Sequence, residues 1–461
     1  MLETGDYVDI RLQTEPRYKK PIGIYWLQAA SVKALGYDAD APIWAYRLPS
    51  LVAMVLSAVL VYLIGLSIAG PGVGLFAAAV FALSLIAGVE ARLAKTDATL
   101  LAFILMAQLA LARGFVGDTG RKRPWLAVLF WTAIGCGVLI KGPVILMVSG
   151  LTLLSLMVFS RSMRPLTVLY PLWGLLWALV LTLPWFLAIW QTAGSSFFSE
   201  SLGKDFLAKV ATGQENHGAP PGSFLVAAFV TFWPGIALLL LALPTVWAQR
   251  KTRPVGFLLA WALPSWAVFE LVATKLPHYV MPLYPALALL TGLALAAGGL
   301  TFGGRWRKLA AGWIPLVALL LAGGLNAGFV IVEGHIDPYG IALAFAGAAV
   351  VIIGSIVMLR ERPRFGLAIA AVGIVGIYAT AYAWLLPRAS HMWASNRIAE
   401  AVESRLTCAA PRLISVATVS RASSSCSARI WRSCLPTKAR GASPKRTAPP
   451  LWWMLARMTP S

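Results

Sequence analysis

Long apolar runs separated by short polar connections dominate the hydrophobic pattern of this 461-residue chain. Each run is close to the roughly 20 apolar residues that an α-helix needs to cross a bilayer. The runs cover residues 50–70, 72–90, 97–115, 124–140, 142–160, 166–191, 223–247, 254–273, 280–300, 309–333, 339–359 and 365–387. Since a helix satisfies its own backbone polar groups within lipid, the pattern predicts an all-α polytopic membrane protein with about twelve transmembrane helices.

The composition agrees with this class and excludes a soluble globular enzyme. Hydrophobic residues make up 59% of the chain and charged residues only 12%, whereas soluble domains carry about 25% charged residues. The net charge of +21 does not indicate nucleic-acid binding, because ten of the basic residues, with no acid among them, lie between Arg405 and Ser461. Many of the others lie in short connections between apolar runs, where they set membrane topology.

Basic residues gather in alternate connections, which all fall on one side of the predicted membrane domain. They are Arg121 to Arg123, Arg161 and Arg164, Arg250 to Arg253, Arg305 to Lys308, and Arg360 to Arg364. By the positive-inside rule this side is the cytoplasm. We therefore expect an external segment with interfacial helices over residues 1–49, a membrane domain over 50–390 and an external C-terminal segment over 391–461. From about Ser415 the sequence indicates either a disordered basic tail or a shifted reading frame.

Residues with distinctive chemistry gather on the opposite side. They are Tyr18 and Lys20 before the first span, Arg92, Lys95 and Asp97 near the third, Lys141 in a tight Lys-Gly-Pro turn, His217 in a Gly/Pro-rich loop, and Lys275, His278 and Tyr279 at a proline-rich span entrance. Taken singly, they are explained as well by interface anchoring, helix capping, snorkelling and solvated turns. Their convergence at one membrane boundary favours a site for a lipid-borne anion. A transporter, which would place its charges nearer the bilayer midplane, is the second hypothesis.

In their order along the chain, these motifs resemble those of the GT-C glycosyltransferases of the family 39/83 type. This group includes the lipid A aminoarabinose transferases and the protein O-mannosyltransferases. The resemblance is strongest to the bacterial aminoarabinose-transferase-like branch and covers about residues 1–390. Its carriers are Met1 to Asp6, Tyr18 to Pro21 with Tyr25 and Trp26, Ala45 to Pro49, Arg92 to Asp97, Lys141 to Pro143, Leu183 to Trp185, His217 with Pro220, and Lys275 to Pro285.

The resemblance implies a GT-C fold with thirteen spans, embedded in the bacterial inner membrane, with its site facing the periplasm. It also implies a catalytic aspartate just after the first of those spans. We expect this span and aspartate upstream of Met1, as if the start codon were assigned too late. The family's general base is therefore assigned to no residue of this chain, and neither Asp6 nor Asp9 takes its place. A truncated, non-catalytic relative is the third hypothesis.

The activity implied by the resemblance is inverting transfer of a sugar from a polyprenyl-phosphate donor to an external lipid, such as a lipid A-like molecule, or to a glycan. A protein O-mannosyltransferase-like reaction is the alternative. A departing lipid phosphate needs fixed cations in a poorly solvated cleft. The phosphate-binding candidates are Lys20, Lys141 and Lys275, supported by Arg92 and Lys95, and the sugar or acceptor candidates are Tyr18, Asp97, His278 and Tyr279. The sequence indicates no certain cofactor; a divalent metal, with His217 as a weak candidate ligand, is the open alternative.

Overall fold

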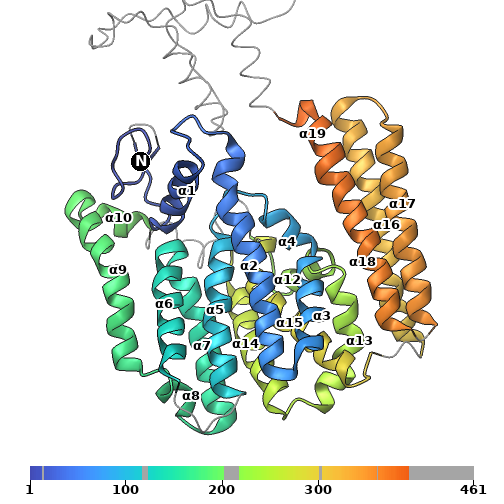
Figure 1. Cartoon of the computed structure of the whole chain (residues 1–461), viewed down its shortest axis with the longest axis horizontal. Coiled ribbons are helices and arrows are strands. Elements are labelled where there is room, and N and C mark those ends of the chain that lie inside the picture. Colours follow the sequence, from blue (N-terminus) through green and yellow to red (C-terminus); the bar gives the residue numbers. More distant parts are fainter. Residues whose placement is uncertain (13–14, 117–122, 202–217, 301–303, 361, 394–461) are drawn as a thin grey trace, which may run out of the picture. The chain divides into compact units, whose positions relative to one another are not determined.

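The computed structural model describes residues 1–12, 15–116, 123–201, 218–300, 304–360 and 362–393. Over these residues the chain is almost entirely helical (Figure 1). A short antiparallel hairpin pairs Arg11–Leu12 (β1) with Glu15–Pro16 (β2). The predicted all-α class is thus confirmed.

The N-terminal part of the chain forms a set of closely packed helices (Figure 1). They are α1 (Gly23–Ala34), α2 (Ile43–Ala69), α3 (Pro71–Ala82), α4 (Leu85–Glu90), α5 (Asp97–Phe115), α6 (Pro124–Lys141), α7 (Pro143–Ser160), α8 (Arg164–Thr167), α9 (Pro171–Ala193) and α10 (Ser196–Phe198). Helix α5 lies between α2 and α6 and contacts both. It is the most completely buried of these spans, which places its first residue in the interior at the end of the helix.

The second part of the chain adds further apolar helices. They are α12 (Ser223–Thr231), α13 (Gly235–Ala248), α14 (Arg253–Leu271), the 3₁₀-helix η3 (Pro277–Leu283), α15 (Tyr284–Ala296), α16 (Arg305–Glu333), α17 (Pro338–Leu359), α18 (Pro363–Ala379), the π-helical turn η4 (Thr380–Leu385), α19 (Leu386–Arg388) and η5 (Ser390–Met392). Helix α15 packs on α3 and α13, so it connects the two parts of the chain through its buried faces.

Within the described residues, ten helices are long and apolar enough to cross a membrane, and eleven if the bent pair α12 and α13 counts as one span. The predicted total of about twelve is therefore not reached by this measure. Multiple spans by length and composition are typical of a multi-pass membrane protein. The difference comes from two apolar runs that the structure interrupts.

The run at 72–90 is broken at Ser84, whose extended backbone separates α3 from α4. The amide of Leu85 donates a hydrogen bond to the carbonyl of Trp233, 3.2 Å away. The run at 223–247 is broken between α12 and α13, with a bend of 115°. Pro234 stands at that break, and a proline ring cannot continue the hydrogen-bond ladder of a helix. The first break leaves Glu90 at the end of a six-residue helix.

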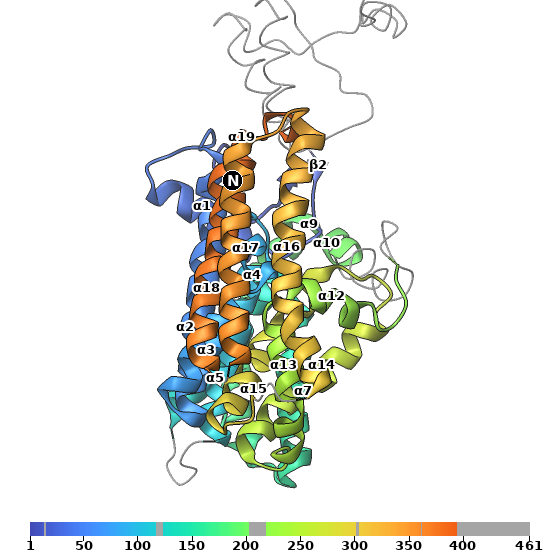
Figure 2. The ribbon, with the colours of Figure 1, turned by 90° about the vertical axis from the view of Figure 1, so that its right-hand side faces the viewer.

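Glycines allow close contact between neighbouring helices. A Cβ atom added to Gly65 of α2 would lie 2.4 Å from the Cα atom of Gly74 in α3. A Cβ atom on Gly373 of α18 would lie 2.5 Å from the carbonyl oxygen of Gly347 in α17, and these helices run side by side in Figure 2. Small residues at such crossings are typical of membrane helix packing, where backbone proximity replaces hydrophobic exclusion of water.

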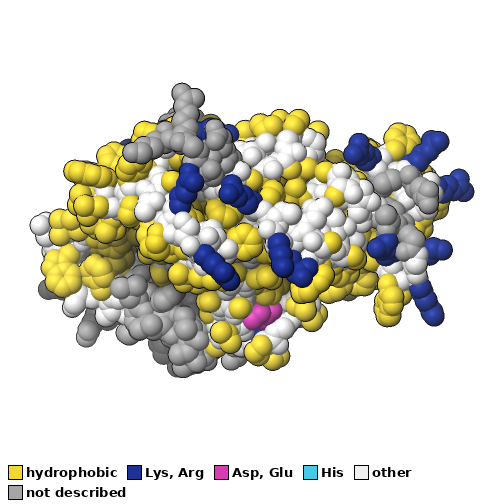
Figure 3. Space-filling model, turned by 90° about the horizontal axis from the view of Figure 1, so that it is seen from below, with side chains coloured by type: hydrophobic (Ala, Val, Ile, Leu, Met, Phe, Trp, Pro, Cys, Tyr) yellow, Lys and Arg dark blue, Asp and Glu magenta, His cyan; other side chains and the backbone are white. Residues whose placement is uncertain are grey.

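Several Lys and Arg side chains lie on the face that Figure 3 shows from below, on a surface that is otherwise mainly hydrophobic or uncharged. The start of α6 and the connections from α7 to α9 and from α13 to α14 lie at this end (Figure 1). They carry Arg123, Arg161, Arg164, Arg250 and Lys251. Asp97 and Lys141 stand at the opposite ends of α5 and α6 from the connection that joins them. The charge asymmetry predicted from the sequence is thus present between the two ends of these helices.

The chain divides into two compact units. The first contains Met1–Gly323 and Ile341–Thr380; the second contains Gly324–Gly340 and, of the residues that the structure describes after Thr380, 381–393. In the second unit Phe329, Leu385 and Ala389 form a small apolar cluster. The predicted boundaries at residues 49 and 390 stay a prediction, and the segment from residue 394 lies outside the described residues.

Candidate active site

An ion pair between Asp97 and Lys141 lies at the centre of the candidate site. Asp97 is the first residue of α5, where the helix dipole favours a carboxylate, and Lys141 is the last residue of α6, where it favours a cation. The Nζ atom of Lys141 lies 2.5 Å from Oδ1 of Asp97, and their side chains are 13% and 9% exposed. The pair therefore joins two neighbouring spans at one end of the bundle.

The turn after Lys141 explains why this lysine is held at the helix end. Gly142 has a φ of +65°, a conformation that residues with a side chain rarely adopt. Pro143 then begins α7 at once, at a position where a proline costs the helix no hydrogen bond. The Lys-Gly-Pro motif thus reverses the chain with almost no loop, as its sequence predicts.

His278 and Glu90 complete the polar cluster. The imidazole of His278 lies between two carboxylates, with Nδ1 3.7 Å from Oε1 of Glu90 and Nε2 3.7 Å from Oδ1 of Asp97. Lys95 lies 4.0 Å from the same Glu90 oxygen. The other carboxylate oxygen of Glu90, Oε2, is buried without a hydrogen-bond partner among the described residues. Burial, and then the charge of Asp97, raise the pKa of Glu90 to about 7.

Glu90 is the member of this cluster that the sequence analysis did not select. Its signal was available, because a carboxylate at the end of an apolar run is costly and is kept there for a partner or a function. Only the break at Ser84 turns α4 inward, so the predicted continuous span placed Glu90 at the membrane boundary. The structure buries its side chain to 2% exposure.

Tyr279 lies directly beside the ion pair. Lys141 Nζ is 5.1 Å from the centre of the Tyr279 ring, a cation–π distance. The ring also meets the His278 ring edge-on, with centroids 5.1 Å apart. Both residues belong to η3, which begins at Pro277 and contains Pro282, so the prolines distort the entrance to α15 as predicted.

Lys20 approaches the same cluster from the N-terminal segment. Its charge acts on both Asp97 and His278. The start of α1 packs closely on the end of α6. A Cβ atom on Gly23 would lie 2.8 Å from the carbonyl oxygen of Leu139, two residues before Lys141. The start of α1 therefore rests on the end of α6 and carries Lys20 with it.

Tyr18 lies in a neighbouring, structural cluster. Its hydroxyl donates a hydrogen bond to Oδ1 of Asp9 at 2.8 Å, and its ring packs edge-on against Phe197. Burial, with the hydrogen bond to Asp9 as the second cause, raises the pKa of Tyr18 to about 12. Asp9 also accepts a hydrogen bond from Arg11 Nε at 2.6 Å. These contacts tie the N-terminal segment together near Lys20.

Lys275 and Arg92 are directed toward backbone carbonyls. Lys275 Nζ donates to the carbonyl oxygens of Glu270 and Val272, at 2.9 and 2.6 Å, at the end of α14. Arg92 is exposed and donates through one guanidinium nitrogen to the carbonyl of Gly88 at 2.7 Å. The structure thus brings together Lys20, Lys95, Asp97, Lys141, His278 and Tyr279. Tyr18, Arg92 and Lys275 instead have hydrogen-bond partners outside this cluster.

The metal prediction gains no ligand set from the residues that the structure describes. Among them, no group of three His, Cys, Asp or Glu side chains is arranged to hold a metal ion. His217, the candidate ligand, lies outside the described residues. The divalent metal therefore stays a prediction.

The sequence of this chain is similar to those of known membrane glycosyltransferases. Residues 19–190 match the family described as dolichyl-phosphate-mannose-protein mannosyltransferase. A Pseudomonas aeruginosa relative named undecaprenyl phosphate-alpha-4-amino-4-deoxy-L-arabinose arabinosyl transferase is 31% identical over 299 residues, which cover 64% of this chain and 53% of the relative. A Pseudomonas fluorescens protein of the same name, numbered 2, is 29% identical over 353 residues, 75% of this chain and 59% of the relative. The chain thus spans somewhat more than half the length of these relatives.

The fold is similar to a solved structure with a lipid-phosphate ligand. The crystal structure of ArnT from Cupriavidus metallidurans bound to undecaprenyl phosphate superposes with a TM-score of 0.73 and 22% identity, over 94% of this chain and 78% of that one. The apo state of the same protein gives a TM-score of 0.66. The region that matches the family model, residues 19–190, contains Lys20, Asp97 and Lys141, whereas His278 and Tyr279 lie beyond it.

Proposed function

We propose that this chain, a relative of the GT-C membrane glycosyltransferases in sequence and fold, transfers a sugar from a polyprenyl-phosphate donor to an external lipid acceptor. The names of the relatives support undecaprenyl phosphate as the carrier and 4-amino-4-deoxy-L-arabinose as the sugar. The motif resemblance supports a lipid A-like acceptor. In the proposed step an oxygen of the acceptor attacks the anomeric carbon with inversion, and the lipid phosphate leaves.

The observation that carries this proposal is the partly buried cation Lys141 at the end of α6, together with Lys20, whose charge acts on the same Asp97. Negative charge develops on the phosphate oxygens as the bond between the phosphate and the anomeric carbon breaks. Cations fixed in advance in a poorly solvated site stabilise that charge far more than mobile cations in water. Lysine ammonium groups suit phosphate as point charges with several donors. Lys141 and Lys20 are accordingly our phosphate-binding assignment, with Lys95 at the edge of the cluster.

The surrounding residues would fix these cations and contact the substrate. Asp97 orients Lys141 through their short contact. His278 and Tyr279 present a ring nitrogen and a hydroxyl from η3, which can hydrogen-bond sugar or phosphate oxygens. A partly protonated Glu90 leaves the cluster with more positive than negative charge near neutral pH, which suits an anionic ligand. We assign the general base for the acceptor to no described residue.

The proposed site faces the outside of the cell. The basic connections lie at the opposite ends of α5 and α6, and the positive-inside rule assigns those connections to the cytoplasm. In a bacterium with two membranes the chain would lie in the inner membrane and its site would face the periplasm. In a variant whose four native cysteines are replaced by serine, a cysteine introduced beside the site, at Ala94, should therefore react with an impermeant thiol reagent added from outside.

The decisive test is a transfer assay with membranes from cells that express the genomic locus. Undecaprenyl phosphate-linked 4-amino-4-deoxy-L-arabinose is the donor and lipid A is the acceptor. Mass spectrometry measures the modified lipid A and the released undecaprenyl phosphate. We expect lipid A to gain the aminosugar while undecaprenyl phosphate is released. The Lys141→Gln variant should lose about 100-fold in rate, the typical effect of removing one group that stabilises developing charge. The matched Lys33→Gln variant, whose lysine lies over Tyr7, should retain the rate.

Two results would overturn the proposal in different ways. Transfer of the sugar onto protein, with none on lipid A, would point to a protein glycosyltransferase. Movement of the donor across the membrane without a covalent product would point to a transporter. A rate that is equal in Lys141→Gln and in the unmodified protein would remove the phosphate assignment.

A further inference from the structure

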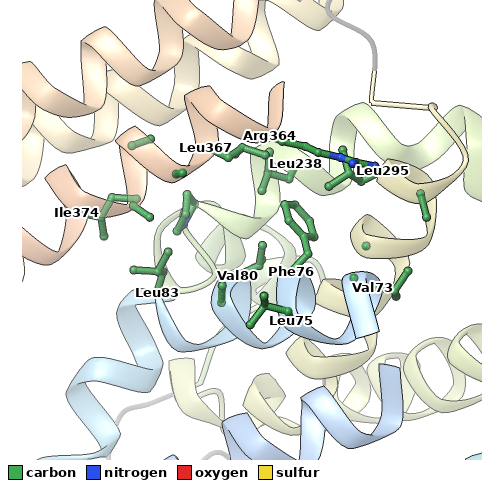
Figure 4. A pocket seen from close by; sticks show the side chains of 18 of the residues that line it. Val73, Leu75, Phe76, Val80, Leu83, Leu238, Leu295, Arg364, Leu367 and Ile374 are labelled. Atoms are coloured by element: carbon green, nitrogen blue, oxygen red, sulfur yellow. The ribbon is translucent and has the colours of Figure 1, made fainter. Parts of the chain in front are cut away.

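An apolar pocket lies at the other end of α15 from the candidate site. Its volume is about 460 Å³, within the range of cavities that hold small ligands. Figure 4 shows its walls, with Val73, Phe76 and Val80 from α3 on one side and Leu367 and Ile374 from α18 on the other. A hydrogen bond joins the two walls, because the Tyr378 hydroxyl of α18 donates to the carbonyl of Leu83, directly after α3, at 2.9 Å.

Arginines stand at one end of this apolar pocket. Among the described residues that line the pocket, Arg364 is the only charged one, and its side chain extends toward Leu295 (Figure 4). Leu295 and Arg364 also line an adjoining hollow of about 530 Å³, to which Arg362 contributes. Both arginines are exposed, and among the residues that the structure describes neither has an ion-pair partner.

This arrangement differs from the candidate site in both position and chemistry. His278 and Tyr279 precede α15, whereas Gly292, Leu295 and Ala296 at its end line the pocket. At 1.5 Å per residue, the helix from Tyr284 to Leu295 separates the two by about 16 Å. The pocket therefore opens at the level of the basic connections, where the positive-inside rule places the cytoplasmic leaflet.

We infer that this pocket binds an anionic glycerophospholipid of the cytoplasmic leaflet, with an acyl chain between α3 and α18 and the phosphate on Arg362 and Arg364. The apolar walls offer nothing to water, and cavities of this kind take up apolar ligands. The arginines offer planar donor sets that match phosphate oxygens. Basic pockets between helices on this side of a membrane bind anionic headgroups for the same reason. The inference does not depend on the proposed transfer reaction.

The test compares lipid retention by variants in nanodiscs that contain equal amounts of phosphatidylglycerol and phosphatidylcholine. Native mass spectrometry counts the lipids that stay bound after extraction. The unmodified protein should retain phosphatidylglycerol preferentially. The Arg362→Gln/Arg364→Gln variant should bind it about 10- to 30-fold more weakly, since each arginine near a membrane surface contributes a few-fold to anionic lipid affinity.

Two further variants separate this site from general charge and from misfolding. Lys251→Gln/Arg253→Gln removes two exposed basic residues of another connection on the same side, away from the pocket, and should retain the lipid. Ala79→Trp/Ala368→Trp fills the pocket from its two walls and should lose the lipid while both arginines remain. The thermal midpoints of all variants report whether they are folded.

Three outcomes would overturn the inference. Equal retention in the arginine variant and the unmodified protein would remove the arginines from the site. Equal retention of phosphatidylcholine would remove the anionic preference. Displacement of phosphatidylglycerol by equimolar undecaprenyl phosphate would assign the pocket to the polyprenyl carrier.

Discussion

The turns after α6 and α14 contain the same short motif, a lysine followed two residues later by a proline, yet the two lysines have different partners. Lys141 ends α6 and forms a short contact with the carboxylate of Asp97. Lys275 follows α14 and donates to the carbonyl oxygens of Glu270 and Val272. Both lysines are partly buried.

The difference arises from what each helix end leaves unsatisfied. The last carbonyls of a helix lack partners in their own helix, and a nearby lysine satisfies them. Lys275 serves α14 in this way, so two of its three donors are used by the backbone. At the end of α6 the neighbouring helix α5 begins with a carboxylate, and Lys141 turns to it. The local motif therefore determines the position of the lysine along the chain, whereas the neighbouring helix determines which group the lysine binds.

The largest effect is expected from Lys141→Met. This change leaves Asp97 buried without its counter-charge, and loss of one partner of a buried ion pair costs about 3–5 kcal/mol of stability. We expect a marked fall in the thermal midpoint of the purified protein, together with a loss of transfer of about 100-fold.

A double variant separates the two effects of that change. Asp97→Asn/Lys141→Met removes both charges, so most of the stability should return while transfer stays low. If the double variant regained the transfer rate together with the stability, Lys141 would have only a structural role. The proposed functional difference between Lys141 and Lys275 would then be wrong.

A pH-dependent effect is expected from Glu90. Its pKa is raised from 4.5 to about 7 in the folded protein, so folding is favoured while the carboxyl group is protonated. This contribution is complete below about pH 4.5 and is lost as the pH rises through about 7, with an upper magnitude on the order of 3 kcal/mol. The thermal midpoint of the unmodified protein should fall between pH 5 and pH 8. Glu90→Gln should flatten that profile, whereas Glu15→Gln, which changes an exposed carboxylate, should leave it unaltered.

The sequence predicted the spans well because apolar runs of about 20 residues have one physical solution in lipid. It predicted the run from Asp97 to Phe115 with the bounds that the structure shows. It did not predict the break at Ser84. At that break the amide of Leu85 donates its hydrogen bond to the carbonyl of Trp233, a residue that is distant in sequence. The burial of Glu90 follows from that break and was missed for the same reason.

The residues of the candidate site were predictable in kind but not in their contacts. Lys141, Asp97 and His278 each stand at a span boundary, which the hydrophobic pattern identifies. The pairing of Lys141 with Asp97 depends on the contact between α5 and α6, and the hydrogen bond from Tyr18 to Asp9 depends on how the segment before α1 folds. Periodicity does not encode those neighbours, so lysines with equal local signals could not be ranked.

Lys20 offers a smaller effect than Lys141. It lies on the segment before α1, half-buried, and its charge acts on Asp97 and His278 from the side. Lys20→Gln should lower transfer about tenfold, the effect of one partly solvated charge contact worth about 1.4 kcal/mol, with normal membrane expression. Transfer at the level of the unmodified protein would remove Lys20 from the phosphate site.

Lys275→Gln should have the smallest effect on transfer and so provides the sharpest check of the contrast. The sequence alone predicts a phosphate-binding role and a loss comparable with that of Lys20→Gln. The hydrogen bonds of Lys275 favour a different result, because a glutamine amide can still donate to one of the two carbonyls. We expect a loss of stability of about 0.5–1.5 kcal/mol, typical of one net hydrogen bond, and a change in transfer of less than about threefold. The assay should follow the rate at saturating donor and the donor concentration at half-maximal rate separately. A rise of tenfold or more in that concentration, with an unchanged thermal midpoint, would show that Lys275 leaves the two carbonyls and binds the donor phosphate. The lysines of the two Lys-x-Pro turns would then have the same function.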